Sequence, residues 1–101
     1  MIVYNNTIKV NNNILQAWNQ WLVEEYIPEI MNTKLFEKYE LYRLLEQEDV
    51  EGPTFVLQFF SHSINDYKTF LNKYATPLRK KEAEKWCQGF VAFRTILEAV
   101  Q

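Results

Sequence analysis

The sequence has very few of the residues that break regular structure or cross-link a chain. Its 101 residues include 2 glycines, 3 prolines and one cysteine, Cys87. So few glycines and prolines predict a chain that is mostly helix and strand, with short connections. A single cysteine excludes a disulfide within the chain and is typical of the reducing cytoplasm, where we expect this protein to reside.

The sequence also lacks the charge and hydropathy patterns of several functional classes. Its net charge is -2, whereas nucleic-acid-binding domains usually show a clear basic excess. No stretch approaches the 18 consecutive apolar residues of a membrane span, and the start lacks the basic segment and apolar run of a signal peptide. We therefore expect neither a nucleic-acid partner nor a membrane.

Residues for metal or nucleophilic chemistry are equally scarce. His62 is the only histidine and is distant in sequence from Cys87, so the two do not support a zinc or iron site. Two glycines cannot build a phosphate-binding loop, and neither a nucleophile elbow nor a Cys–His pair is present. The sequence therefore predicts no metal and no cofactor.

The sequence does contain enough apolar residues for one core. Its strand and helix patterns alternate along the chain. Hydrophobic residues make up 48% of the chain, which suits a single domain over residues 1–101. Helical patterns begin near Ile14 and Ile64, and Pro28 and Pro77 should interrupt or restart them. Strands are expected at 2–10, 35–46, 54–60 and 90–100. This βαββαβ order predicts an α+β ferredoxin-like fold with a four-stranded antiparallel sheet.

Both faces of the expected sheet are rich in apolar residues. In the third strand, apolar residues occupy both alternating sets, with Phe55, Leu57 and Phe59 opposing Val56 and Phe60. Helices cover only one face of such a sheet, so the other face needs a partner. A second copy of the chain, packed sheet to sheet in a symmetric homodimer, is the simplest cover.

Several stretches of the chain resemble known proteins. They are MIVYN at 1–5, W-x-x-W at 18–21, IPE at 27–29, YRLLEQ at 42–47, EGPTFVLQFF at 51–60 and FVAFRT at 90–95. Through them the chain resembles a family of short uncharacterised bacterial proteins, whose members often carry a histidine where Tyr26 stands here. More broadly, the chain resembles the dimeric α/β barrel superfamily, in which two ferredoxin-like subunits pack sheet to sheet. The superfamily includes monooxygenases, haem-degrading enzymes, isomerases and ligand sensors, so the fold alone does not indicate which function this chain has.

Polar residues that interrupt the apolar strands are candidate ligand-binding groups. They are Asn5, Arg43, Gln58 and Arg94. A guanidinium within an apolar strand needs a partner, because burying an unpaired charge is costly. If all four share the face without helices, they form a polar patch inside the dimer that could bind a carboxylate or phosphate. The alternative is a set of salt bridges with Glu40, Glu46 or Glu98 that fixes the register of the dimer.

Aromatic residues and the histidine give a second group of candidates. Trp18 and Trp21 lie three residues apart on one helical face and could wall an aromatic ligand site near Tyr26, although packing in the core is the simpler role. His62 has the intrinsic pKa of a general base. Its place between two serines after a strand is more typical of a helix-capping loop.

Charged residues concentrate in the two helical regions. The first region ends with Glu24, Glu25 and Glu29, and the second carries basic residues of 79–85 interleaved with two glutamates. Paired carboxylates can perform acid–base chemistry when burial separates their pKa values. Because charges on helices are usually solvated, we interpret both groups as exposed surfaces.

The sequence leaves three functions open. The first is a dimeric small-molecule-binding or interaction module without demonstrable catalysis, which fits the lack of a nucleophile or metal set. The second is a cofactor-independent monooxygenase- or isomerase-type enzyme acting on a small aromatic or quinone-like substrate, which needs a cavity between helices and sheet. The third is haem degradation with His62 as the iron ligand, for which a loop is an unfavourable place.

Overall fold

The stretches with strand patterns pair into one antiparallel sheet. In the computed structural model, which describes residues 1–101, the strands are β1 (Ile2–Val10), β2 (Lys38–Arg43), β3 (Thr54–Ser61) and β4 (Phe90–Glu98). Their order in the sheet is β2-β3-β1-β4, which confirms the ferredoxin-like arrangement with the second and fourth strands at the edges. β2 is shorter than expected, because Phe36 packs into the core before the strand begins.

Each helical region passes through its proline instead of breaking there. α1 (Leu15–Trp21) continues through a π-helical turn, η1 (Leu22–Tyr26), into α2 (Ile27–Met31), and α3 (Ile64–Phe70) continues through η2 (Leu71–Ala75) into α4 (Thr76–Trp86). Pro28 and Pro77 each lie in the first turn after a π turn. A proline lacks the N–H that an α-helix needs and crowds the carbonyl four residues earlier, and the wider π turn accommodates both effects. None of these helices combines the length and apolar character needed to cross a bilayer.

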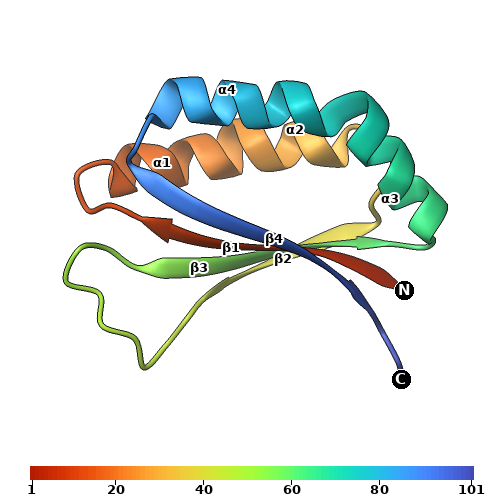
Figure 1. Ribbon diagram of the computed structural model, residues 1–101, viewed down its shortest axis with the longest axis horizontal. Coiled ribbons are helices and arrows are strands. Elements are labelled where there is room, and N and C mark those ends of the chain that lie inside the picture. The colour runs from red at the N-terminus through yellow and green to blue at the C-terminus, as the bar shows by residue number, and fades with distance from the viewer.

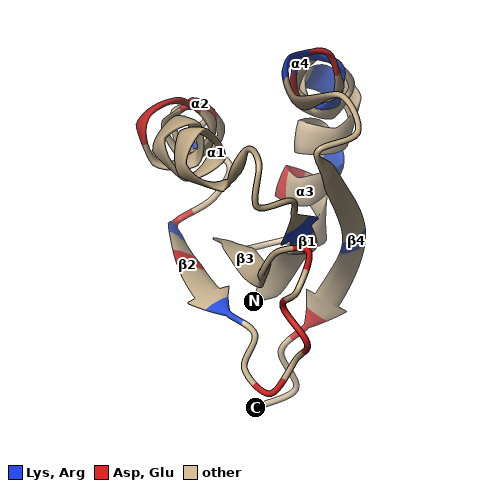
Figure 2. Ribbon diagram, turned by 90° about the vertical axis from the view of Figure 1, so that its left-hand side faces the viewer, with Lys and Arg blue, Asp and Glu red and all other residues tan.

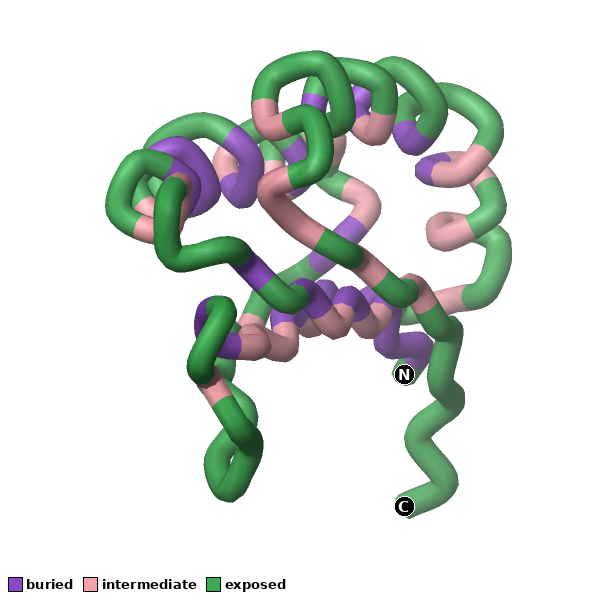
Figure 3. Tube along the Cα trace, turned by 60° about the vertical axis from the view of Figure 1, so that its left-hand side comes forward, coloured by how far each residue is buried: buried purple, intermediate pink, exposed green.

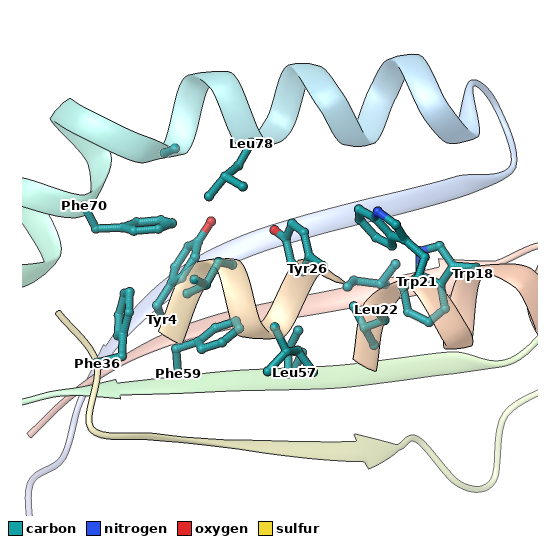
Figure 4. Packing of buried hydrophobic residues seen from close by; sticks show 14 of the residues in the cluster. Tyr4, Trp18, Trp21, Leu22, Tyr26, Phe36, Leu57, Phe59, Phe70 and Leu78 are labelled. Carbon is teal, nitrogen blue, oxygen red and sulfur yellow. The ribbon is translucent and has the colours of Figure 1, made fainter. Parts of the chain in front are cut away.

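All the helices lie on one side of the sheet, and the opposite side is open (Figure 1). The core between the two layers is strongly aromatic (Figure 4). Trp18 is fully buried and stacks on Phe55, with 5.5 Å between ring centroids. Tyr4 of β1 packs between Phe59 of β3 and Phe70 of α3, at 6.3 and 5.4 Å. Each such side chain stabilises the fold by roughly 2–3 kcal/mol through burial, so these contacts hold the helices on the sheet.

The open face of the sheet has one polar row between two mainly apolar rows. The polar row crosses all four strands in register and consists of Glu40, Gln58, Asn5 and Thr95. Gln58 donates a hydrogen bond to Asn5 at 3.1 Å, and Asn5 donates one to Thr95 at 3.3 Å. The flanking apolar side chains include Val3, Phe60 and Leu97 on one side and Tyr42, Val56 and Phe93 on the other. The open face is therefore less uniformly apolar than the sequence suggested.

The four polar strand residues Asn5, Arg43, Gln58 and Arg94 do not form the single patch on this face that their sequence pattern predicts. Asn5 and Gln58 lie on it, but Arg94 faces the helices. The reason is strand register: Asn5 pairs with Thr95, so Thr95 takes the open-face position and its neighbour Arg94 points to the other side. Arg43 also lies on the helix side, at the edge of the sheet, and pairs with Asp49 at 2.7 Å. Neither arginine therefore uses the salt-bridge partners expected from the sequence.

Candidate functional site

A groove runs between the two helical regions on the outer side of the helix layer. Figure 2 shows these regions standing apart above the sheet, with acidic residues on α2 and both signs of charge on α4. The main part of the groove has a volume of about 410 Å³, and its aromatic and apolar lining comes from Trp21, Tyr26 and Leu78. Its rim is charged and consists of Glu25, Glu29, Lys81, Glu84 and Lys85. A further hollow of about 280 Å³ continues it toward Tyr74 and Pro77.

An ion pair spans this groove between α2 and α4. The Nζ atom of Lys81 lies 3.0 Å from Oε1 of Glu29, and both residues line the two parts of the groove. Both side chains are well exposed, so the pair contributes at most about 1 kcal/mol to stability. A ligand that enters the groove from solvent could therefore displace this ion pair at little cost.

Tyr26 lies at the floor of the groove because it ends the π turn η1. Only 3% of it is exposed, and its ring packs against Trp21 with 4.9 Å between centroids. The hydroxyls of Tyr26 and Tyr4 both point toward α4 (Figure 4). Burial and the negative charge of Glu82 raise the pKa of Tyr26 far above its usual value, although Arg94 opposes this shift. The hydroxyl is therefore protonated at neutral pH and can donate a hydrogen bond.

A buried ion pair lies beside Tyr26, underneath α4. The Nη2 atom of Arg94 donates to Oε1 of Glu82 at 2.6 Å, and the two side chains are 19% and 3% exposed. Glu82 is one helical turn after Leu78, so α4 presents a groove-lining residue and a buried carboxyl on the same face. Burial raises the pKa of Glu82, and the positive charges of Arg94 and Arg79 oppose this rise.

A second arginine joins this group from the same helix. The Nη2 atom of Arg79 donates to the hydroxyl of Tyr4 at 3.0 Å, and Tyr4 is almost fully buried. We call Tyr4, Tyr26, Arg79, Glu82 and Arg94 the arginine cluster. It contains two guanidinium groups and one carboxyl. The Nε atoms of both arginines are buried without a hydrogen-bond partner.

The chemistry available at this site follows from these groups. The guanidinium and tyrosine groups can donate hydrogen bonds, and Glu82 can gain or lose a proton. A group of three or more His, Cys, Asp or Glu side chains that could ligate a metal does not occur. The site is therefore suited to recognising an oxygen-bearing molecule and to moving a proton.

The structure brings together only some of the residues singled out by the sequence. Trp21, Tyr26 and Arg94 meet at or beneath the groove, whereas Trp18 is core, as its simpler interpretation predicted. His62 is well exposed after β3 and contacts Glu37. It does not line the groove, so it is not placed to hold an iron there.

Sequence reasoning missed Tyr4, Arg79 and Glu82. The charged segment of residues 79–85 was interpreted as a solvated surface, yet Glu82 is buried and Arg79 is half-buried. A signal for Glu82 was present, because it lies four residues from both Leu78 and Trp86 and so falls on the apolar face of its helix. No comparable signal marked Arg79, whose partner Tyr4 lies 75 residues away.

Comparisons with known proteins agree with this architecture. The family model described as "Domain of unknown function (DUF4286)" matches residues 1–100. No curated protein matches the sequence.

Several solved structures are similar to this one. A protein from Deinococcus radiodurans, provisionally described as an antibiotic biosynthesis monooxygenase, has a TM-score of 0.72 and 14% identity, covering 100% of this chain and 94% of its own. A dimeric ferredoxin-like protein from an uncultured marine organism has a TM-score of 0.69 and 11% identity, and the match covers 100% of this chain and 96% of the marine protein. A MhuD variant with manganese protoporphyrin IX bound has a TM-score of 0.68 and 15% identity, and the match covers 100% of this chain and 96% of the MhuD chain. At these identities the likeness establishes the fold alone.

Proposed function

This chain belongs to the DUF4286 family, and from its own geometry we propose that it is a homodimeric protein that binds a small molecule in the groove between its helical regions. The supporting observation is the position of the groove, whose floor residue Tyr26 belongs to the buried arginine cluster. Small-molecule sites combine apolar and aromatic walls with a few converging polar groups, in volumes of roughly 300–1,000 Å³. The groove has a volume within this range and an aromatic and apolar wall, and its rim is more charged than that of a typical pocket.

A binding screen with matched groove variants tests this role. We expect a thermal-shift screen of small aromatic acids, phenols, quinones and amines to find compounds that raise the Tm of the wild-type protein. Lys81→Trp, which places a bulky ring at the groove, is expected to weaken their binding by about tenfold or more. Lys80→Trp makes the same change at the adjacent exposed residue outside the groove and serves as the control. Absence of any binder, or equal binding by the two variants, would contradict the proposal.

Catalysis by proton transfer is a second candidate function. The observation that favours it is the buried position of Glu82 beside Tyr26, because burial raises the pKa of Glu82 while Tyr26 stays protonated. Pairs of titratable groups held apart in pKa are a common basis of acid–base catalysis. Turnover of a small aromatic or quinone-like compound that is lost in Glu82→Gln would favour this function. A ligand that binds and remains unchanged would favour the binding role.

We place the homodimer interface on the open face of the sheet. This face exposes large apolar side chains, including Phe93 at 67% and Leu97 at 45%. Figure 3 shows the exposed C-terminal part of β4 in green. The polar row through Asn5 and Gln58 supports a specific pairing, because a shifted partner would bury these amides against apolar rows. The similar marine protein described as dimeric adds support from the fold.

Phe93→Lys is expected to convert the dimer to a monomer. Two-fold symmetry would bury two unpaired ammonium groups in one interface, which is costly. Native mass spectrometry should give twice the 12.2 kDa chain mass for the wild-type protein and the single mass for the variant. Val23→Lys, at an exposed apolar residue of η1, should remain dimeric. A monomeric wild-type protein would contradict the proposed dimer. A dimeric Phe93→Lys variant would show that the dimer forms through another surface.

The proposed setting is the reducing cytoplasm. Cys87 is the only cysteine in the chain and is exposed at the end of α4. An exposed thiol remains free in a reducing compartment, whereas oxidising conditions would convert it to disulfides with other molecules.

A further inference from the structure

We infer that the ligand bound in the groove is an anion with an apolar body, and that the arginine cluster receives its carboxylate or equivalent oxyanion group. The inference rests on the proposed binding role and adds the chemical class of the ligand. It comes from the charge of the cluster, its free hydrogen-bond donors and its position relative to the groove.

The cluster has an excess of positive charge. Arg79 and Arg94 both act on the single carboxyl of Glu82, and the remaining polar partners, Tyr4 and Tyr26, are neutral hydroxyls. Tyr67 of α3 also lies within reach of Arg79 and is neutral. Two guanidinium groups against one carboxylate leave one positive charge at a partly buried site, because Arg79 is half-buried and Arg94 is 19% exposed. One bound anion would neutralise this charge.

The arginines also have donors left for an incoming group. Arg94 uses Nη2 for Glu82, and Arg79 uses Nη2 for Tyr4. In each residue the Nε atom is buried and has no partner. Buried donors in folded proteins are almost always paired. A carboxylate accepts parallel hydrogen bonds from guanidinium groups, and it matches this unsatisfied set in both charge and geometry.

The groove determines how the rest of the ligand would lie. Tyr26 lines the groove and also belongs to the cluster, so groove and cluster adjoin at this side chain. The side chain of Arg94 is 19% exposed. An aromatic body would pack on Trp21 and Tyr26 with its acidic group directed inward. The rim includes three carboxylates and two ammonium groups and so does not itself attract anions. Selection for an anion would therefore come from the arginine cluster beneath.

Three probes of one shape test the inference: 2-naphthoate, 2-naphthol and 2-naphthylmethylamine, measured by calorimetry near neutral pH. We expect the wild-type protein to bind 2-naphthoate about tenfold or more tightly than the alcohol or the amine. Arg79→Met should reduce 2-naphthoate binding to about the level of 2-naphthol while leaving 2-naphthol binding unchanged. Arg79→Lys, which keeps the charge but lacks the planar donors, should weaken 2-naphthoate binding less and provides a second variant if the first fails to fold.

Lys80→Met is the control, because it removes one positive charge from the adjacent exposed residue outside the groove. The outcomes separate the two proposals. If 2-naphthol or the amine binds as tightly as 2-naphthoate, the binding role stands and the inference is wrong. If Lys80→Met weakens 2-naphthoate binding as much as Arg79→Met, the preference is a general charge effect and the inference is also wrong. If none of the three probes binds, the inference is wrong, and the broader thermal-shift screen decides whether the binding role stands.

Discussion

Replacing Arg94 with leucine is expected to destabilise the protein by about 3 kcal/mol, whereas replacing both Arg94 and Glu82 with leucine should recover most of that loss. Glu82 is 3% exposed, so removing its partner leaves an almost fully buried carboxylate. Breaking a buried ion pair is costly for this reason. Replacing both charges with apolar side chains removes the desolvation cost together with the attraction, and the result is often neutral or stabilising.

Denaturant unfolding of the wild-type protein, both single variants and the double variant checks this expectation as a double-mutant cycle. Glu82→Leu alone should also destabilise the protein, because it leaves Arg94 without its carboxylate. A double variant that loses the sum of the two single effects would contradict the argument. It would mean that these residues stabilise the fold independently and not as a pair.

The same variants should differ in how stability depends on pH. Burial raises the pKa of Glu82 above its ordinary value of 4.5, so the folded chain holds this proton at pH values where the unfolded chain has released it. Unfolding then releases a proton, and this group makes stability fall as pH rises from 4.5 through the raised pKa. The double variant lacks the carboxyl and should show a flatter profile over that interval. Parallel profiles would show that the pKa of Glu82 is not raised by folding.

Gly52→Ala is expected to destabilise the protein by at least about 3 kcal/mol. Gly52 has a φ of +151°, and a Cβ atom there would lie 1.7 Å from the carbonyl oxygen of Val10. The loop cannot move away easily, because backbone hydrogen bonds on both sides of Gly52 tie it to the end of β1. They join Val10 to Pro53 at 3.0 Å and Asn12 to Glu51 at 2.9 Å.

Gly89→Ala is the matched control for this prediction. A Cβ atom at Gly89 would lie 2.5 Å from Cδ1 of Ile14, which is the movable end of a side chain. We expect a cost of about 1 kcal/mol, which lowers the Tm of a domain this size by roughly 4–8 °C. Thermal and urea unfolding of the two variants should therefore separate clearly. Equal losses would show that the contact with Val10 is relieved by a loop movement.

The order of the elements and the ferredoxin-like topology could be predicted from the sequence. Both follow from local periodicity, because alternating residues such as Ile2, Tyr4, Ile8 and Val10 mark a strand with one buried face in any context. The prolines show the limit of local reasoning. Pro28 signalled a disturbance of the helix, but whether it breaks or widens depends on packing against the sheet, which here keeps Tyr26 buried at the end of a π turn.

The arginine cluster, by contrast, depends on the tertiary structure. Arg94 was recognised as unusual in an apolar strand, but its face depends on the register between β1 and β4, and a shift of one residue reverses every side chain. Its partner Glu82 was hidden among charges on a helix that looked solvated. Arg79 and Tyr4 meet across 75 residues of chain. Periodicity is a property of neighbours in sequence, whereas the arginine cluster is a property of four elements that come together only when the helices pack on the sheet.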